Sequence, residues 1–234
     1  MGGEVRFPFD RDRPPQGPYI PRHPVAMSPP KAQQPSSHSS PALSAPASPA
    51  LEWLWQYLRD VRHPQLLDCG PVSQASLNVF LKRGAKVYVA DLLTPLLQGE
   101  PAYWTRNNKT ILFRLDEFLK QLPPIAPDSL DIIFSWQLFD LLPRDVLGGL
   151  VERFWSYLKP GGMLFCLLRE PYLPAGAGTS WSFESLTVLS PKVESCQPFP
   201  YPAVTNREVE RLLPGGNVKT FLTRGARREV LGVK

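Results

Sequence analysis

From Leu51 onward, short apolar runs that favour β-strands alternate with segments whose apolar residues recur at helical spacing. The strand-like runs are 65–70, 86–91, 110–113, 130–135 and 163–168. The helical segments are 51 to about His63, 73–82, 117–122 and 147–158. Strands that alternate with helices are typical of α/β domains built on a parallel sheet. The pattern therefore predicts an α/β fold over 51–234, with buried strands and helices on both faces of the sheet.

The pattern loosens after Arg169, where Pro, Gly, Ser and aromatic residues fill 170–203 and only 185–189 looks like a strand. A helix is predicted over 206–213, followed by two β-like runs, 218–223 and 228–233. A short Arg-Gly-Ala turn joins these two runs. We therefore expect the domain to end in an antiparallel hairpin added to an otherwise parallel sheet.

The first 50 residues differ in composition from the rest of the chain. Twelve of the 28 prolines lie there, among Ser, Ala, Gln and Gly, with almost no periodic apolar pattern. Such a segment buries too little apolar surface to offset the entropy lost on ordering. Residues 1–50 are therefore predicted to be a disordered tail in front of the folded domain.

Composition also bears on where the chain works and on what it binds. The start, MGGEVRFPFD, has no apolar stretch of a secretory signal, and no segment approaches the length of a membrane span. The three cysteines have neither metal nor disulfide spacing, so we expect a cytoplasmic protein without a membrane partner. The net charge of +5 is spread along strand-like segments rather than interleaved with aromatics, which disfavours nucleic-acid binding.

Acidic residues close the first two strand-like runs, at Asp68 and at Asp91. In open α/β sheets, ligands bind beyond the carboxyl ends of the strands, where the strand order reverses. A carboxylate at such a place can accept hydrogen bonds from both hydroxyls of a ribose. The sequence therefore favours a nucleotide-type ligand at this edge.

Five segments follow one another along about 51–234: Leu-Leu-Asp-Cys-Gly, Val-Tyr-Val-Ala-Asp-Leu, Arg-Leu-Asp, Leu-Asp-Ile-Ile-Phe-Ser-Trp and Tyr-Leu-Lys-Pro-Gly-Gly-Met-Leu. The chain thereby bears a resemblance to class I S-adenosylmethionine-dependent methyltransferases. It implies a Rossmann-like, seven-stranded, mostly parallel sheet with S-adenosylmethionine as the cofactor.

The resemblance also implies a role for particular residues. The loop under the methionine part of the cofactor would be Asp68, Cys69 and Gly70, while Asp91, followed by Leu92, would hold the ribose. Asp116, with Glu117, would bind the adenine amine, and Ser135, Trp136 and Gln137 would line the floor near the transferred methyl group. Plainer roles stay open for the same residues: Asp68 as a loop or helix cap, Asp91 as a strand end, Asp116 as an N-cap, Cys69 as core packing and Trp136 as a lid on the core.

The glycine-rich loop departs from the family pattern. Gly70 is present, but Val72 and Gln74 stand where the second and third glycines belong, and Pro71 removes one backbone N–H. The leading hypothesis is methyl transfer to an unidentified small-molecule or protein acceptor, with specificity in 170–203. The alternative is a pseudoenzyme that acts as a binding or scaffold module, which the altered loop favours. The absence of Gly-x-Gly-x-x-Gly argues against a nicotinamide-dependent oxidoreductase.

Overall fold

The computed structural model describes residues 47–107, 110–169, 179–193, 201–215, 217–223 and 227–234. Most of the predicted tail, 1–46, lies outside the described residues, so its disorder stays a prediction. The first helix, α1 (Pro49–Tyr57), begins inside that predicted tail, with Ser48 as its N-cap accepting from the N–H of Leu51. The buried carboxylate of Glu229 accepts from the Ser48 hydroxyl at 2.7 Å, which fixes the start of α1 to the sheet.

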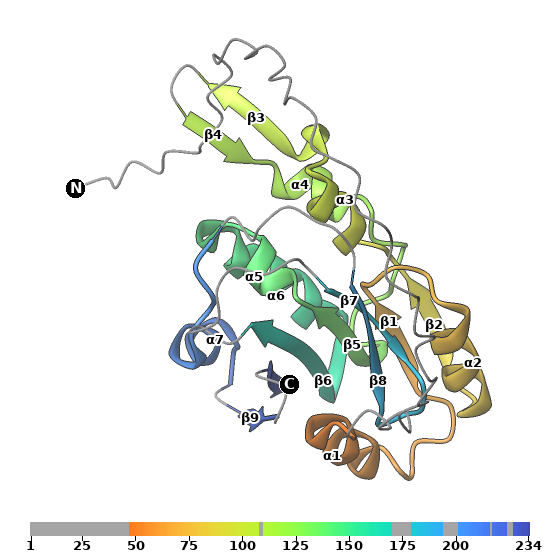
Figure 1. The fold of residues 1–234 in the computed structure, drawn as a ribbon. Helices are drawn as coiled ribbons and strands as arrows, with labels where there is room; N and C mark the ends of the chain where they lie inside the picture. Colours follow the sequence, from red (N-terminus) through yellow and green to blue (C-terminus); the bar gives the residue numbers. More distant parts are fainter. Residues whose placement is uncertain (1–46, 108–109, 170–178, 194–200, 216, 224–226) are drawn as a thin grey trace, which may run out of the picture. The chain divides into compact units, whose positions relative to one another are not determined.

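Within the described residues, six strands form the central sheet in the order β2-β1-β5-β6-β10-β9 (Figure 1). Their bounds are β1 (Gln65–Asp68), β2 (Lys86–Val89), β5 (Leu130–Trp136), β6 (Leu158–Arg169), β9 (Val218–Leu222) and β10 (Arg227–Val233). The first four of these in space are parallel, whereas β10 runs antiparallel to both β6 and β9. The predicted α/β class, the mostly parallel sheet and the closing antiparallel pair are confirmed.

The prediction of seven strands is wrong for the part of the chain that the structure describes, because the run 110–113 does not join this sheet. Instead, β4 (Thr110–Phe113) pairs antiparallel with β3 (Trp104–Asn107) as a separate two-stranded sheet. Phe113 packs edge-on against the rings of Trp104 and Phe118, at centroid distances of 5.0 and 5.5 Å. The backbone of β4 therefore pairs with a strand nearby in the sequence, and its Phe113 packs in a local aromatic cluster. Neither interaction needs the central sheet.

The helices after α1 are α2 (Gln74–Lys82), α3 (Leu93–Gln98), α4 (Leu115–Leu119), α5 (Leu138–Leu141), α6 (Leu147–Tyr157) and α7 (Asn206–Leu212), with short 3₁₀ turns η1 (Pro101–Tyr103) and η2 (Arg144–Val146). Helices α2, α6 and α7 lie where they were predicted, α4 begins two residues before the predicted 117–122, and α3 and α5 were not predicted. Ser73 caps α2 by accepting from the N–H of Ser76, and Gly84 follows this helix with φ +76°. The first helix ends at Tyr57, earlier than the predicted end near His63.

A second hairpin corrects the strand predicted at 185–189. Its strands are β7 (Thr179–Phe183) and β8 (Leu189–Val193), so most of the predicted strand is the turn between them. The Ser185 hydroxyl accepts from the N–H groups of Thr187 and Val188, which favours a turn over an extended chain.

The connections between the strands run in two directions along the sheet. The chain moves one way along the sheet from β1 through α2 to β2, and the other way from β5 through α6 to β6. Right-handed crossovers in opposite directions place α2 and α6 on opposite faces of the sheet. The strand order therefore reverses between β1 and β5, whose carboxyl ends flank the crevice where such folds bind ligands.

The core lies around β5, all seven residues of which are buried. A parallel strand covered on both faces is expected to be apolar throughout, and Leu130–Trp136 meets this expectation except at Asp131 and Ser135. On one face, Phe80 of α2 stacks on Phe134 at 5.6 Å. Among the described residues, no helix combines the length and the apolar character needed to cross a membrane.

Candidate functional site

The carboxyl ends of β1 and β5, where folds of this kind open a crevice for a ligand, bring three predicted site residues together. Asp68 ends β1, Gly70 follows it, and Trp136 ends β5. Oδ1 of Asp68 accepts a hydrogen bond of 2.6 Å from Nε1 of the Trp136 indole and one of 2.9 Å from the backbone N–H of Gly70. The loop predicted to lie under the cofactor is thus tied to a side chain of the protein itself.

Burial dominates the electrostatics of Asp68. Its exposed fraction is 5%, and burial raises the pKa of this carboxyl from 3.8 to about 6. The hydrogen bonds from Trp136 and Gly70 oppose this rise in pKa, whereas the negative charge of Asp91 adds to it. Asp68 and Asp91 therefore lie close enough to interact, as expected for adjacent parallel strands.

Trp136 fills the crevice rather than lining it. The residue is 1% exposed, and its ring contacts those of Phe134, Phe165 and Phe183 at centroid distances of 6.0, 6.2 and 5.5 Å. Its backbone has φ +50°, in the left-handed region that a bulky residue rarely adopts. Of the two interpretations from the sequence, the packing agrees with a lid on the core.

The Trp136 indole lies so close to the backbone of residue 70 that this residue has to be a glycine. A Cβ at position 70 would lie 2.7 Å from Nε1 of Trp136 and 3.2 Å from Oδ1 of Asp68, so a side chain would displace one of them. The glycine lets its backbone approach the tryptophan in the way that a glycine loop approaches a ligand.

The residues that replace the other two loop glycines do not block the crevice. Val72 is 70% exposed, and among the described non-glycine residues only Asp128 and Trp136 have positive φ. Gln74 begins α2, and its amide donates to Oδ1 of Asn78 at 2.9 Å. The altered loop is therefore accommodated without strain at Val72, and it is Trp136 that closes the crevice.

The second acid, Asp91, lies just beyond β2 and is partly exposed. Its Oδ1 accepts from the N–H of Thr94 at 2.9 Å, at the start of α3. Leu92, which follows it, is fully buried and donates its N–H to the carbonyl oxygen of Cys69 at 3.1 Å. This backbone bond connects the ends of β1 and β2, so Asp91 stands beside the crevice.

The predicted adenine-binding acids lie on α4. Asp116 is exposed, and within the described part of the chain it has no hydrogen bond or ion pair. Glu117 pairs with Arg114 at 2.5 Å and with Lys120 at 2.9 Å, both one turn away or less. No contact brings either acid to Asp68 or Asp91, and their role in adenine binding stays a prediction.

Ser135 and Gln137, the remaining predicted floor residues, are buried. The Ser135 hydroxyl donates to the carbonyl oxygen of Phe165 at 2.9 Å and lies 3.2 Å from Sγ of Cys166, so it bridges β5 and β6. The carbonyl oxygen of Gln137 accepts from the N–H of Asp140 at 3.0 Å as α5 begins. These contacts stabilise the sheet and the start of α5.

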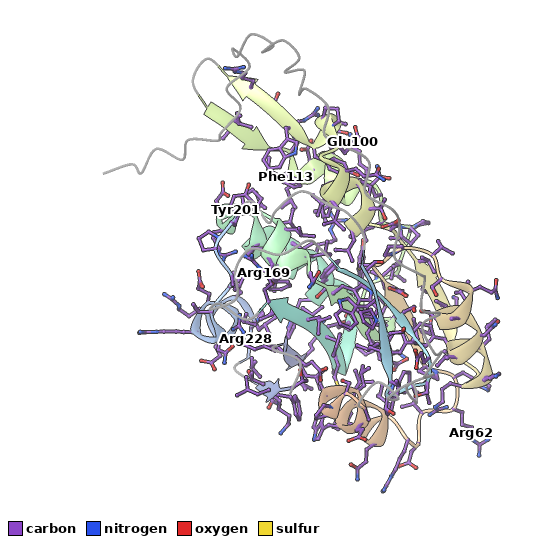
Figure 2. The ribbon with its side chains drawn as sticks, viewed as in Figure 1. Arg62, Glu100, Phe113, Arg169, Tyr201 and Arg228 are labelled. Atoms are coloured by element: carbon purple, nitrogen blue, oxygen red, sulfur yellow. The ribbon has the colours of Figure 1, made fainter. Side chains whose placement is uncertain are left out.

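A buried polar cluster at the end of β6 was not predicted from the sequence. Asp140 has no exposed surface, and its carboxylate accepts from the N–H groups of Arg169 and Val204 at 2.7 and 3.0 Å. Burial raises the pKa of Asp140. Figure 2 shows Arg169, Tyr201 and Arg228, and the first of these donates to the carbonyl oxygen of Tyr201 at 2.7 Å.

Arg228 completes this cluster by donating to the carbonyl oxygens of Arg169 and Val204 and to Oδ1 of Asn206. The cluster thereby fastens the chain before α7 to the carboxyl end of β6. The signal in the sequence was a single acid, Asp140, within the apolar run 138–142.

The described residues offer neither an activated thiol nor a metal site. Burial raises the pKa of the Cys69 thiol well above its ordinary value and that of Cys166 to about 12. No group of three His, Cys, Asp or Glu side chains within the described ranges could hold a metal ion. The expectation that Cys69 packs in the core is confirmed by its complete burial.

The residues at this edge differ in how their hydrogen-bonding groups are used. Asp91 is partly exposed, and among the described residues one of its two carboxylate oxygens accepts a hydrogen bond. The indole of Trp136 occupies the space beside Gly70 and uses Oδ1 of Asp68 as its acceptor. The space beside Gly70 is therefore closed in this conformation.

No protein-family model matches the sequence, and none of the curated proteins compared with it matches. Among solved structures, the chain is similar to 1,6-didemethyltoxoflavin-N1-methyltransferase from Burkholderia thailandensis, which was solved with 1,6-didemethyltoxoflavin and S-adenosylhomocysteine bound. The identity is 15%, the match covers 80% of this chain and 76% of that chain, and the TM-score is 0.42.

Two further solved structures are similar in the same way. A putative type 11 methyltransferase from Sulfolobus solfataricus is 14% identical, with 81% of this chain and 94% of that chain covered and a TM-score of 0.43. A SAM-dependent methyltransferase from Archaeoglobus fulgidus is 11% identical, with 79% and 93% covered and a TM-score of 0.43. All three of these solved structures are named as methyltransferases.

Proposed function

We propose that the domain binds S-adenosylmethionine at the carboxyl edge of its sheet and transfers the methyl group to an unidentified acceptor. The observation that carries the proposal is the placement of Asp91, a partly exposed carboxylate at the end of β2, beside the point where the strand order reverses. The sheet order and the antiparallel C-terminal strands, which agree with the resemblance, support it.

Asp91 suits a ribose because of how its two oxygens are used. Oδ1 accepts from the N–H of Thr94 and so holds the carboxylate in one orientation, whereas among the described residues no hydrogen bond engages Oδ2. A fixed carboxylate with a free acceptor oxygen binds a diol with little loss of side-chain entropy.

Calorimetric titration of the full chain with S-adenosylhomocysteine and with adenosine tests this proposal. Asp91→Asn keeps the size of the side chain but removes its charge, and is expected to weaken binding by about 1–3 kcal/mol for each ligand. The matched control is Asp60→Asn, at a carboxylate whose side chain is 90% exposed. Equal affinities for the wild type and Asp91→Asn would contradict the assignment of Asp91.

A second candidate function is a non-catalytic module that keeps the fold and binds or scaffolds a partner. One specific observation favours it, namely that Trp136 fills the crevice at the end of β5. The same titration separates the two candidates. A folded protein that binds neither adenosine nor S-adenosylhomocysteine at millimolar concentration would favour the module.

A further inference from the structure

The side chain that closes the crevice occupies the position expected for part of a ligand. Gly70 has no side chain, and Nε1 and Cδ1 of Trp136 lie 2.7 and 3.0 Å from the position that a Cβ would take there. A glycine in this loop lets another group come close to the backbone. Here the group that approaches is the edge of the indole ring.

The indole also takes the hydrogen-bonding capacity of the loop. Its N–H donates to Oδ1 of Asp68, the atom that also accepts from the Gly70 N–H. The methionine end of S-adenosylmethionine carries an ammonium group, a donor that would need an acceptor of this kind. Trp136 and such a ligand would therefore compete for the same carboxylate as well as for the same space.

The backbone at Trp136 has the features of a residue that can change conformation. Its φ of +50° is costly for a bulky side chain, and the pairing of β5 with β6 shifts register between Phe134 and Trp136. Strain of this kind persists only where the surroundings enforce it, and here the surroundings are the bond to Asp68 and the ring of Phe183 on the β7–β8 hairpin.

We propose that Trp136 is an internal occupant of the crevice, which excludes the methionine end of S-adenosylmethionine until the indole moves away. This inference rests on the proposed function, because it concerns the same binding edge. The occupant blocks one end of the ligand only, since the indole is bonded to Asp68 at the end of β1 and not to Asp91 at the end of β2.

The expected consequence is a reduced apparent affinity. A ligand that binds only the open form has its dissociation constant raised by the inverse of the fraction of open molecules. Removal of the indole is therefore expected to lower the dissociation constant of S-adenosylhomocysteine by about ten- to a hundredfold. Adenosine lacks the methionine end, so its dissociation constant should change by less than about threefold.

The experiment compares the full-length wild type with Trp136→Ala, using calorimetric titration with S-adenosylhomocysteine and with adenosine. Trp53→Ala is the matched control, because this tryptophan stacks on Tyr57 of α1 at 5.2 Å and has Lys219 over its ring. Circular dichroism and thermal unfolding establish that each variant is folded. If the alanine variant fails to fold, Trp136→Phe replaces it, because phenylalanine keeps an aromatic ring but lacks the N–H that donates to Asp68. An intermediate gain in affinity for S-adenosylhomocysteine is then expected.

The outcomes separate the two proposals. Tighter binding of S-adenosylhomocysteine by the Trp136 variant, with adenosine binding and the Trp53→Ala variant unchanged, supports the proposal that Trp136 occupies the crevice. Equal binding of S-adenosylhomocysteine by wild type and folded Trp136 variants overturns this proposal but leaves the proposed function intact. Failure of every folded variant to bind either ligand overturns the proposed function, and with it the proposal about Trp136.

Discussion

Asp68 and Asp91 are the same residue type at the carboxyl ends of neighbouring parallel strands, but their surroundings differ. Asp68 is buried, accepts two hydrogen bonds through one oxygen, and has its pKa raised to about 6. Asp91 is partly exposed and uses one oxygen to hold the start of α3. The difference comes from Trp136, which covers the first aspartate and is not bonded to the second.

This comparison shows that the position of an acid in a strand-helix pattern does not establish whether a ligand can reach it. The pattern in the sequence is nearly identical for the two residues. Accessibility is decided by a residue 68 positions further along the chain, which the fold brings to the adjacent strand end. Substitution of Asp68 is therefore expected to change the free energy of unfolding most, and substitution of Asp91 least.

The largest expected effect is on the pH dependence of stability, tested with Asp68→Asn. A carboxyl with a raised folded-state pKa stabilises fully below the unfolded value of 3.8, and this contribution is lost as the pH rises through about 6. The variant keeps an acceptor for both hydrogen bonds but does not titrate. Its free energy of unfolding relative to wild type should therefore rise by about 3 kcal/mol between pH 3 and pH 8.

Urea unfolding at several pH values measures this difference. Asp60→Asn provides the control, since the Asp60 side chain is 90% exposed and the variant should follow the wild type throughout. A constant difference between Asp68→Asn and wild type over the whole range would show that Asp68 is not buried as described.

A smaller effect is expected from a methyl group at position 70. Gly70→Ala places a Cβ against the indole and should destabilise the protein by about 1–3 kcal/mol through overpacking. Gly148→Ala is the matched control, because it lies in α6 with no heavy atom within 4 Å of its Cβ position. That control should instead gain about 0.5–1 kcal/mol from helix propensity. The same sign for both variants in urea unfolding would argue against the close contact at Gly70.

The smallest effect is expected at the exposed acid. Asp91→Ala removes the hydrogen bond to the Thr94 N–H and should lower the free energy of unfolding by about 1 kcal/mol. Asp91→Asn keeps an acceptor oxygen and should be close to wild type in stability, although it is expected to bind ligand less well. A large loss of stability in Asp91→Asn would indicate that the residue is structural.

The parts of the fold that the sequence predicted are those with strong local signals. The buried run in β5 and the apolar face of α6 follow from periodicity, and the Ser73 cap and Gly84 from local backbone requirements. Strand partners are a matter of tertiary structure, so the pairing of β4 with β3 could not be read from its apolar run. The turn at Ser185 was mistaken for a strand because its hydrogen bonds to the backbone leave no mark in an apolar pattern.

The candidate site was predicted less completely for a related reason. Asp68, Gly70 and Trp136 were all named from the resemblance, but the sequence gives no distances, so the contact among them could not be foreseen. The glycine loop departs from the family pattern at Val72 and Gln74, but the Val72 side chain is 70% exposed and the Gln74 amide is bonded to Asn78 within α2. The cluster around Asp140 joins β6 to the chain before α7, and contacts of this separation have no sequence signature beyond a lone buried acid.

The most direct test of the account is the ¹H–¹⁵N spectrum of the indole groups, of which the chain has six. Trp136→Phe identifies the signal of Trp136, and exchange with deuterated water measures its protection. A buried indole bonded to Asp68 should exchange slowly and have a chemical shift that titrates near pH 6, and this titration should be lost in Asp68→Asn. Rapid exchange, with no shift between pH 4 and pH 8, would contradict the claim that Trp136 fills the crevice.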